Sequence, residues 1–202
     1  MMTQTHLLIA VTALARSNAK TRNRAVIAGA LIPDIAIYGL FVVAILTGIP
    51  QSELWDAVYW QAGWQSVFAI GNSAPLYFSI LLIALLAKRK NSAAWPEWLS
   101  VFACAALLHL VADFPVHSDD AHQHFWPFTN WRFHSPLSYW EHDHYGMWVG
   151  LFESVLGIAC ALIITYRFKR LWVSLTVGVM SLPYLLRPAT LLWEFTKGFG
   201  QG

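Results

Sequence analysis

Long apolar runs dominate this sequence. Four of them, at about residues 25–48, 66–87, 147–166 and 171–195, are long enough to cross roughly 30 Å of hydrocarbon as helices. A fifth, at about residues 98–114, is shorter, but at about 1.5 Å per residue it still covers most of that thickness. Apolar residues make up 57% of the chain and charged residues 12%, about half the charged share of a soluble domain. The sequence therefore predicts an all-α polytopic membrane helix bundle with about five transmembrane helices, forming a single integral membrane domain over residues 1–202.

Further expectations concern a short helix near the N-terminus and the position of Arg187 in the last apolar run. The apolar segment at residues 5–15 is too short to span, and we predict a short helix that packs against the bundle or dips into it. A secretory signal peptide would carry positive charge before its apolar core, whereas here the basic residues follow it, so we expect this segment to stay on the mature protein. Arg187 is expected near an interface, where it could pair with Glu194 or a lipid phosphate.

Basic residues form three short clusters, at residues 16–24, 88–90 and 167–170. Five spans place all three clusters on one face, which the positive-inside rule makes cytoplasmic. The long segment 114–146 then lies on the opposite, periplasmic side of a bacterial inner membrane, where its tryptophans suit the interface. A formal net charge of +2 in scattered clusters excludes a nucleic-acid partner and leaves membrane lipids as the expected one.

Seven of the eight histidines lie between residues 109 and 144, together with several carboxylates. His109 and Asp113 are four residues apart, so on a helix they share one face and could hold a single cation. His122 and His124 have a His-x-His spacing, which in extended chain points both imidazoles to one side, and His142 and His144 repeat it. Imidazole and carboxylate are the usual ligands of zinc, and the lack of cysteine here disfavours a structural thiolate site. We therefore predict a divalent metal, zinc first, in an open site of the catalytic type.

A polar loop also needs histidines for solvation and hydrogen bonding, so not every imidazole has to be a ligand. We interpret His134 in that way. His109 and Asp113 are interpreted as functional, because ionisable groups at the edge of the hydrocarbon are costly and usually face a partner or a cavity. For the other histidines of the segment both interpretations remain open: His117, His122, His124 and His144.

Two distant residues extend the candidate site. Asp34 follows Pro33 inside an apolar stretch, and the proline is expected to loosen the helix there. If segment 5–15 runs inward and segment 24–33 returns, His6 and Asp34 lie at similar depth and face His109. The alternatives are a hydrogen-bonded helix break for Asp34 and an interfacial histidine for His6. The complete set of candidate ligands is His6, Asp34, His109, Asp113, His117, His122, His124 and His144, with Asp119, Asp120 and Glu141 as candidate bases or as carboxylates that orient a ligand.

Three short motifs, Thr5-His6, Pro33-Asp34 and His109-Leu110-Val111-Ala112-Asp113, resemble those of the bacterial membrane-bound metal-dependent hydrolases. This resemblance implies a metal site and a hydrolytic activity. The hydrolases carry a His-Arg-Gly-x-Thr-His-Ser type of segment between the last two motifs, where this chain has Gly71-Asn72-Ser73. Asparagine is a poorer zinc ligand than histidine, so either the metal differs, the site is rebuilt from the outer loop, or hydrolysis has been lost.

A closer resemblance is to a group of bacterial membrane proteins often labelled cobalamin biosynthesis protein CobQ. It covers residues 60–77 and the run from His109 to Trp140. The label implies a soluble amidotransferase acting on corrinoids. A five-span bundle of this size is too small to contain the catalytic apparatus of such an enzyme. We do not expect that activity here.

Three functions remain as hypotheses. The first is a membrane-bound metal-dependent hydrolase acting on lipid phosphoesters at headgroup depth. The second is a non-catalytic accessory subunit or assembly factor of a larger membrane complex, docking through the aromatic residues of the outer loop, which are Phe125, Trp126, Phe128, Trp131, Phe133, Tyr139 and Trp140. The third is transport of a metal or small solute, for which the inner halves of the spans carry few polar residues to mark a path, apart from Asp34 and Glu153.

Overall fold

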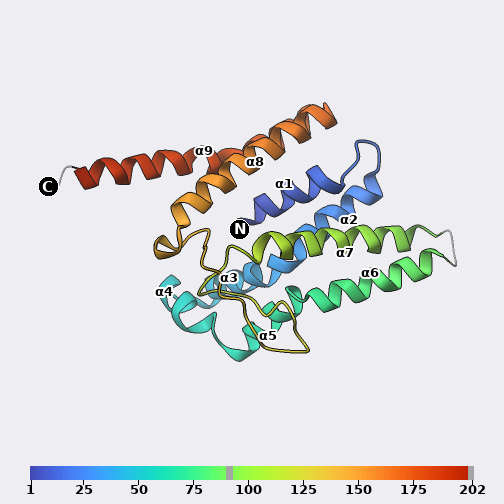
Figure 1. The fold of residues 1–202 in the computed structure, drawn as a ribbon, viewed down its shortest axis with the longest axis horizontal. Coiled ribbons are helices and arrows are strands. Elements are labelled where there is room, and N and C mark those ends of the chain that lie inside the picture. Colours follow the sequence, from blue (N-terminus) through green and yellow to red (C-terminus); the bar gives the residue numbers. More distant parts are fainter. Residues whose placement is uncertain (90–92, 200–202) are drawn as a thin grey trace.

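The computed structural model describes residues 1–89 and 93–199, with side chains described as far as Arg187 (Figure 1). This described part is helical and contains no strand. The elements are α1 (Thr3–Leu14), α2 (Lys20–Leu31), η1 (Ile32–Asp34), α3 (Ile35–Thr47), α4 (Gln51–Glu53), η2 (Leu54–Val58), α5 (Ala62–Gly71), α6 (Ala74–Lys88), α7 (Ala94–Asp113), η3 (His142–His144), α8 (Gly146–Phe168) and α9 (Leu171–Phe199).

Four helical segments among the described residues are long and apolar enough to cross a membrane: Lys20–Thr47, Ala62–Lys88, Ala94–Asp113 and Gly146–Phe168. The first two continue through a break, at η1 and between α5 and α6. The segments Thr3–Leu14 and Leu171–Arg187 are shorter apolar helices. The all-α membrane fold is therefore confirmed, while the predicted span at 171–195 extends beyond the side chains that are described.

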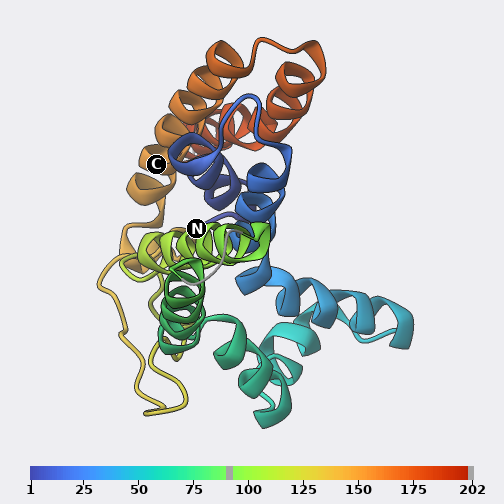
Figure 2. The ribbon, with the colours of Figure 1, turned by 90° about the vertical axis from the view of Figure 1, so that its right-hand side faces the viewer.

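The helices pack as neighbouring pairs. α7 contacts α2 and α6 along its length, α8 pairs with α9, and α1 lies between α8 on one side and α2 and α7 on the other (Figures 1 and 2). Small residues bring α2 and α7 together: a Cβ at Gly29 would collide with the backbone oxygen of Phe102. Close backbone approach of this kind is how helices associate where apolar surface alone gives no preference over lipid.

The two ends of the bundle differ in chemistry. The α1–α2 connection, the end of α6 and the α8–α9 connection lie together at the right of Figure 1, and these carry the three basic clusters, except Lys90, which is outside the described residues. The long connection between α7 and α8, residues 114–145, lies at the opposite end.

Two helix breaks face each other near that end. Pro33 lies in η1, and the amide Nδ2 of Asn72, between α5 and α6, donates to the backbone oxygen of Phe68 at 3.0 Å and of Pro33 at 3.5 Å. A Cβ at Gly71 would lie only 3.1 Å from that Pro33 oxygen. Irregular backbone at membrane depth is tolerated where protein buries it and satisfies its polar groups. The paired breaks therefore fix the position of Asp34, the residue that ends η1.

Candidate metal centre

Asp113, the last residue of α7, is the hub of a buried polar cluster. Its Oδ1 lies 2.9 Å from His6 Nε2, 3.1 Å from His117 Nε2 and 2.5 Å from the amino group of Met1. Its Oδ2 lies 3.2 Å from Nε2 of His109, one helical turn earlier. Only 2% of Asp113 is exposed. Imidazoles from α1, from α7 and from the following loop thus converge on one carboxylate.

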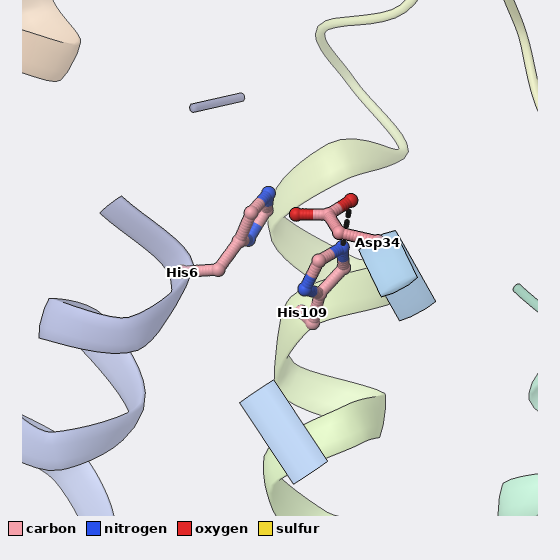
Figure 3. A group of neighbouring side chains, drawn as sticks. All are labelled: His6, Asp34 and His109. Carbon is pink, nitrogen blue, oxygen red and sulfur yellow. Dashed lines mark ion pairs between the residues drawn. The ribbon is translucent and has the colours of Figure 1, made fainter. Parts of the chain in front are cut away.

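The first group of possible ligands comprises His6, Asp34 and His109 (Figure 3), whose candidate ligand atoms all lie within 4.8 Å of one another. His6 and His109 stack with ring centroids 3.6 Å apart. The carboxylate of Asp34 enters from η1, and its Oδ2 accepts a hydrogen bond of 2.5 Å from the hydroxyl of Thr3. Two helices, α1 and α7, and the short η1 turn between α2 and α3 therefore supply this group.

The orientation of His109 determines which of its nitrogens faces the cluster. Its Nδ1 lies 2.8 Å from the backbone oxygen of Ala30, and because a carbonyl only accepts, Nδ1 carries the proton. In a neutral imidazole Nε2 then holds a lone pair, and it faces oxygens of Asp113 at 3.2 Å and Asp34 at 3.5 Å. A lone pair there would repel the two carboxylates, so the contact needs either a second proton on the imidazole or a bound cation among the three groups. This is the arrangement that outer partners impose on metal-ligating histidines.

The second group comprises Asp113, His117 and His122, again with candidate ligand atoms within 4.8 Å of one another. Asp120 supports it from the loop, with Oδ2 at 2.9 Å from His117 Nδ1. All three members of the group are buried. Because Asp113 also contacts His6 and His109, the two groups share its carboxylate and form one continuous centre.

The loop histidines of this centre differ in charge. Burial alone lowers the pKa of His117, but the carboxylates of Asp113 and Asp120 outweigh it and raise the pKa to about 9. Burial and the neighbouring charge of His117 lower the pKa of His122 to about 3, and burial also lowers the pKa of His124. For Asp120, the contact with His117 outweighs burial and lowers the pKa. His122 is therefore neutral at pH 7, the form in which an imidazole ligates a metal.

Several buried polar atoms of the centre have no hydrogen-bond partner among the described residues: His6 Nδ1, His109 Nε2, His117 Nδ1 and Asp120 Oδ1. Some of them lie close to another polar atom without the alignment that a hydrogen bond needs. Buried polar atoms in folded proteins are nearly always satisfied, so this many in one place calls for an explanation. Nitrogen and carboxylate donors held close and unsatisfied fit a divalent cation of the zinc type.

The other predicted residues lie outside these two groups. His124 is buried, but its Nδ1 lies 3.2 Å from the backbone oxygen of Asn72, so it ties the loop to the α5–α6 break. Asp119, Glu141 and His144 form a third, more exposed set, apart from Asp113. His134 Nδ1 donates to the backbone oxygen of Ser118 at 2.8 Å, as expected for a residue outside the site.

Sequence reasoning missed the network that holds α1 in place. Glu153 of α8 is fully buried and accepts hydrogen bonds from the backbone N–H of Met2 at 2.6 Å and the hydroxyl of Thr5 at 2.7 Å. Arg187 of α9 lies 3.4 Å from the same carboxylate and also donates to the backbone oxygen of Tyr139. Two opposite charges in neighbouring spans were the available signal. The predicted partner Glu194 lies beyond the described side chains.

No protein-family model, curated protein or solved structure matches this chain. The candidate centre is therefore interpreted from its own residues.

Proposed function

We propose that this protein is a membrane-bound metal-dependent hydrolase whose centre is built around Asp113. The observation that carries the proposal is the sharing of this carboxylate by two buried groups, His6–Asp34–His109 and Asp113–His117–His122. These residues would hold one or two divalent cations, zinc first. Histidine and carboxylate ligands without cysteine are typical of catalytic rather than structural sites.

A divalent cation bound there lowers the pKa of a coordinated water and polarises a phosphoryl oxygen. Other residues of the chain position the ligands. Ala30 fixes the tautomer of His109, and Asp120 orients His117 from the loop. Thr3 holds one oxygen of Asp34, which leaves the other free to face His109. His109 and His117 are buried, and the low dielectric around them strengthens their charge interactions with the carboxylates.

We propose a lipid phosphoester as the substrate, because Asp113 ends the membrane-crossing segment Ala94–Asp113 and the His-rich loop follows it, which in this proposal corresponds to the depth of lipid headgroups. Exposed aromatic side chains around it, including Trp140 and Trp148, suit a membrane interface. The basic clusters at the opposite end favour a cytoplasmic position for that end, which puts the His-rich loop on the periplasmic side of a bacterial inner membrane.

The test is release of inorganic phosphate from phosphatidic acid in mixed micelles by purified protein. We expect zinc-dependent turnover that falls at least about a hundred-fold in Asp113→Asn, the size of effect typical for a lost catalytic group. Asp119→Asn is the matched control, because Asp119 is exposed and outside the two buried groups. Turnover that survives both chelation and Asp113→Asn would contradict the proposal.

A second candidate, an accessory subunit of a membrane complex, is favoured by the exposure of four loop aromatics, Phe125, Phe128, Trp131 and Trp140. Not all the predicted docking residues contribute, because Phe133 stacks on Phe114 with centroids 4.7 Å apart. Under this proposal the untagged protein extracted in mild detergent migrates as a complex, and Phe128→Ser/Trp131→Ser releases it. A monomer in both cases contradicts the subunit role.

A further inference from the structure

A cavity of about 720 Å³ lies at the end of the bundle opposite the candidate metal centre. Its walls come from α1, α2, α8 and α9 and are largely apolar, with Leu7, Val11, Ile27, Ile164 and Val177 among the lining residues. The volume lies within the roughly 300–1,000 Å³ of pockets that bury a small ligand. Nothing in the proposed hydrolase chemistry uses this cavity.

All the charged residues of its lining are basic. Lys20, Arg24 and Arg170 line the cavity, and no acidic residue does. None of these three side chains has an ion-pair partner in the described part of the chain, whereas the neighbouring Arg22 bonds the backbone oxygen of Leu14 and lies 3.6 Å from Glu97. Three uncompensated cations therefore border an apolar space.

The backbone adds to this positive field. α2 begins at Lys20, and no side chain caps its first amides. Free amides at a helix start carry partial positive charge and suit a phosphate. On its own this helix start would be satisfied by water, but here it coincides with unpaired cations at an apolar cavity.

We propose that the cavity binds one anionic phospholipid, with an acyl chain along the apolar walls and the phosphate at Lys20, Arg24 and Arg170. The acyl chain alone gives little preference over surrounding lipid, because lipid tails are as apolar as the cavity walls. Selectivity then comes from the headgroup, at about a five-fold preference for each basic residue near an anionic lipid. The inference is independent of the metal centre and of hydrolysis.

The test is native mass spectrometry of delipidated, purified protein titrated with dioleoyl phosphatidylglycerol or dioleoyl phosphatidylcholine, which share their acyl chains and differ in charge. We expect one phosphatidylglycerol to be retained with at least a ten-fold preference over phosphatidylcholine. Lys20→Gln/Arg24→Gln/Arg170→Gln should lose that preference. The matched control Lys88→Gln/Arg89→Gln removes basic residues at the same end that do not line the cavity, and it should keep the preference.

Two further arms identify the ligand as a lipid. Thr176→Trp places an indole at the cavity wall from an exposed position of α9 and should reduce retention by about ten-fold with all charges intact. Inorganic phosphate in excess should leave the bound lipid in place. Equal retention of both lipids by wild type, an equal loss in the control, no effect of Thr176→Trp, or displacement by phosphate would each overturn the proposal.

Discussion

His6 of α1 and His109 of α7 stack their imidazole rings, with centroids 3.6 Å apart and 15° between the ring planes (Figure 3). Through this contact α1, a short apolar helix, contributes a side chain to the polar centre. α1 packs between α8, α2 and α7, and hydrogen bonds from Met2 N–H and Thr5 to Glu153 hold its first turn on α8. The start of α1 therefore connects the metal centre, through His6, with the Glu153 network, through Met2 and Thr5.

The two adjacent aspartates of the loop should behave differently. Asp120 contacts His117 Nδ1 at 2.9 Å, whereas Asp119 is exposed and belongs to neither buried group. We expect Asp120→Asn to weaken zinc affinity by about 10–100-fold, as loss of a carboxylate behind a ligating histidine does. Asp119→Asn should change it less than two-fold. Competition titration with a zinc chelator measures both, and equal effects would refute the assigned role of Asp120.

Two glycines provide a paired test of helix packing. A Cβ at Gly157 of α8 would collide with the ring of Tyr184, while a Cβ at Gly178 of α9 would meet nothing within 4 Å. We expect Gly157→Ala to lower the free energy of unfolding by about 1–3 kcal/mol, the range for overpacking. Gly178→Ala should leave it unchanged or slightly higher, because alanine is the better helix former. Thermal unfolding in detergent compares the two, and the reverse order would be inconsistent with the α8–α9 contact.

Glu153 should be important for stability. Glu153→Ala removes the acceptor for Met2 N–H and Thr5 and the counter-charge of Arg187, and we expect a loss of about 3 kcal/mol. Glu153→Gln keeps an acceptor oxygen and should lose less. Thermal unfolding in detergent measures stability, and zinc content should fall with it in Glu153→Ala because His6 is released. A stable Glu153→Ala protein would show that α1 is held by other contacts.

The proposed orientation can be measured with single cysteines in a background where Cys104 and Cys160 are serine. Asp143, in the loop at the metal end, and Lys169, between α8 and α9, are exposed at opposite ends of the bundle. We expect an impermeant maleimide to label Asp143→Cys in intact cells and Lys169→Cys only after permeabilisation. The opposite pattern would place the candidate centre on the cytoplasmic side.

Local spacing predicted part of the centre. The i, i+4 relation of His109 and Asp113 is a property of the helix itself, and Pro33 marked the break that carries Asp34. The structure brings both carboxylates to His109, and it also places His6 there, which depended on how α1 returns along the bundle.

Other features arise only from tertiary packing. The break at Asn72 is marked locally by Pro75 in the first turn of α6, but its contact with Pro33 joins segments far apart in sequence. Likewise, nothing local separates His122, which joins the buried centre, from His144, which lies with Glu141 and Asp119. The loop path decides between such histidines, and loops lack the periodicity that makes helices predictable.

The central claim is that the centre around Asp113 holds a metal. The most direct measurement is elemental analysis of protein purified in mild detergent without a histidine tag, loaded with zinc and desalted, comparing wild type with His109→Ala/Asp113→Ala. We predict one or two equivalents of zinc in the wild type and a loss of at least one in the double variant, with Asp119→Asn unchanged. A wild-type protein that retains no zinc, manganese or iron after loading, or a double variant that retains as much as the wild type, would contradict the account.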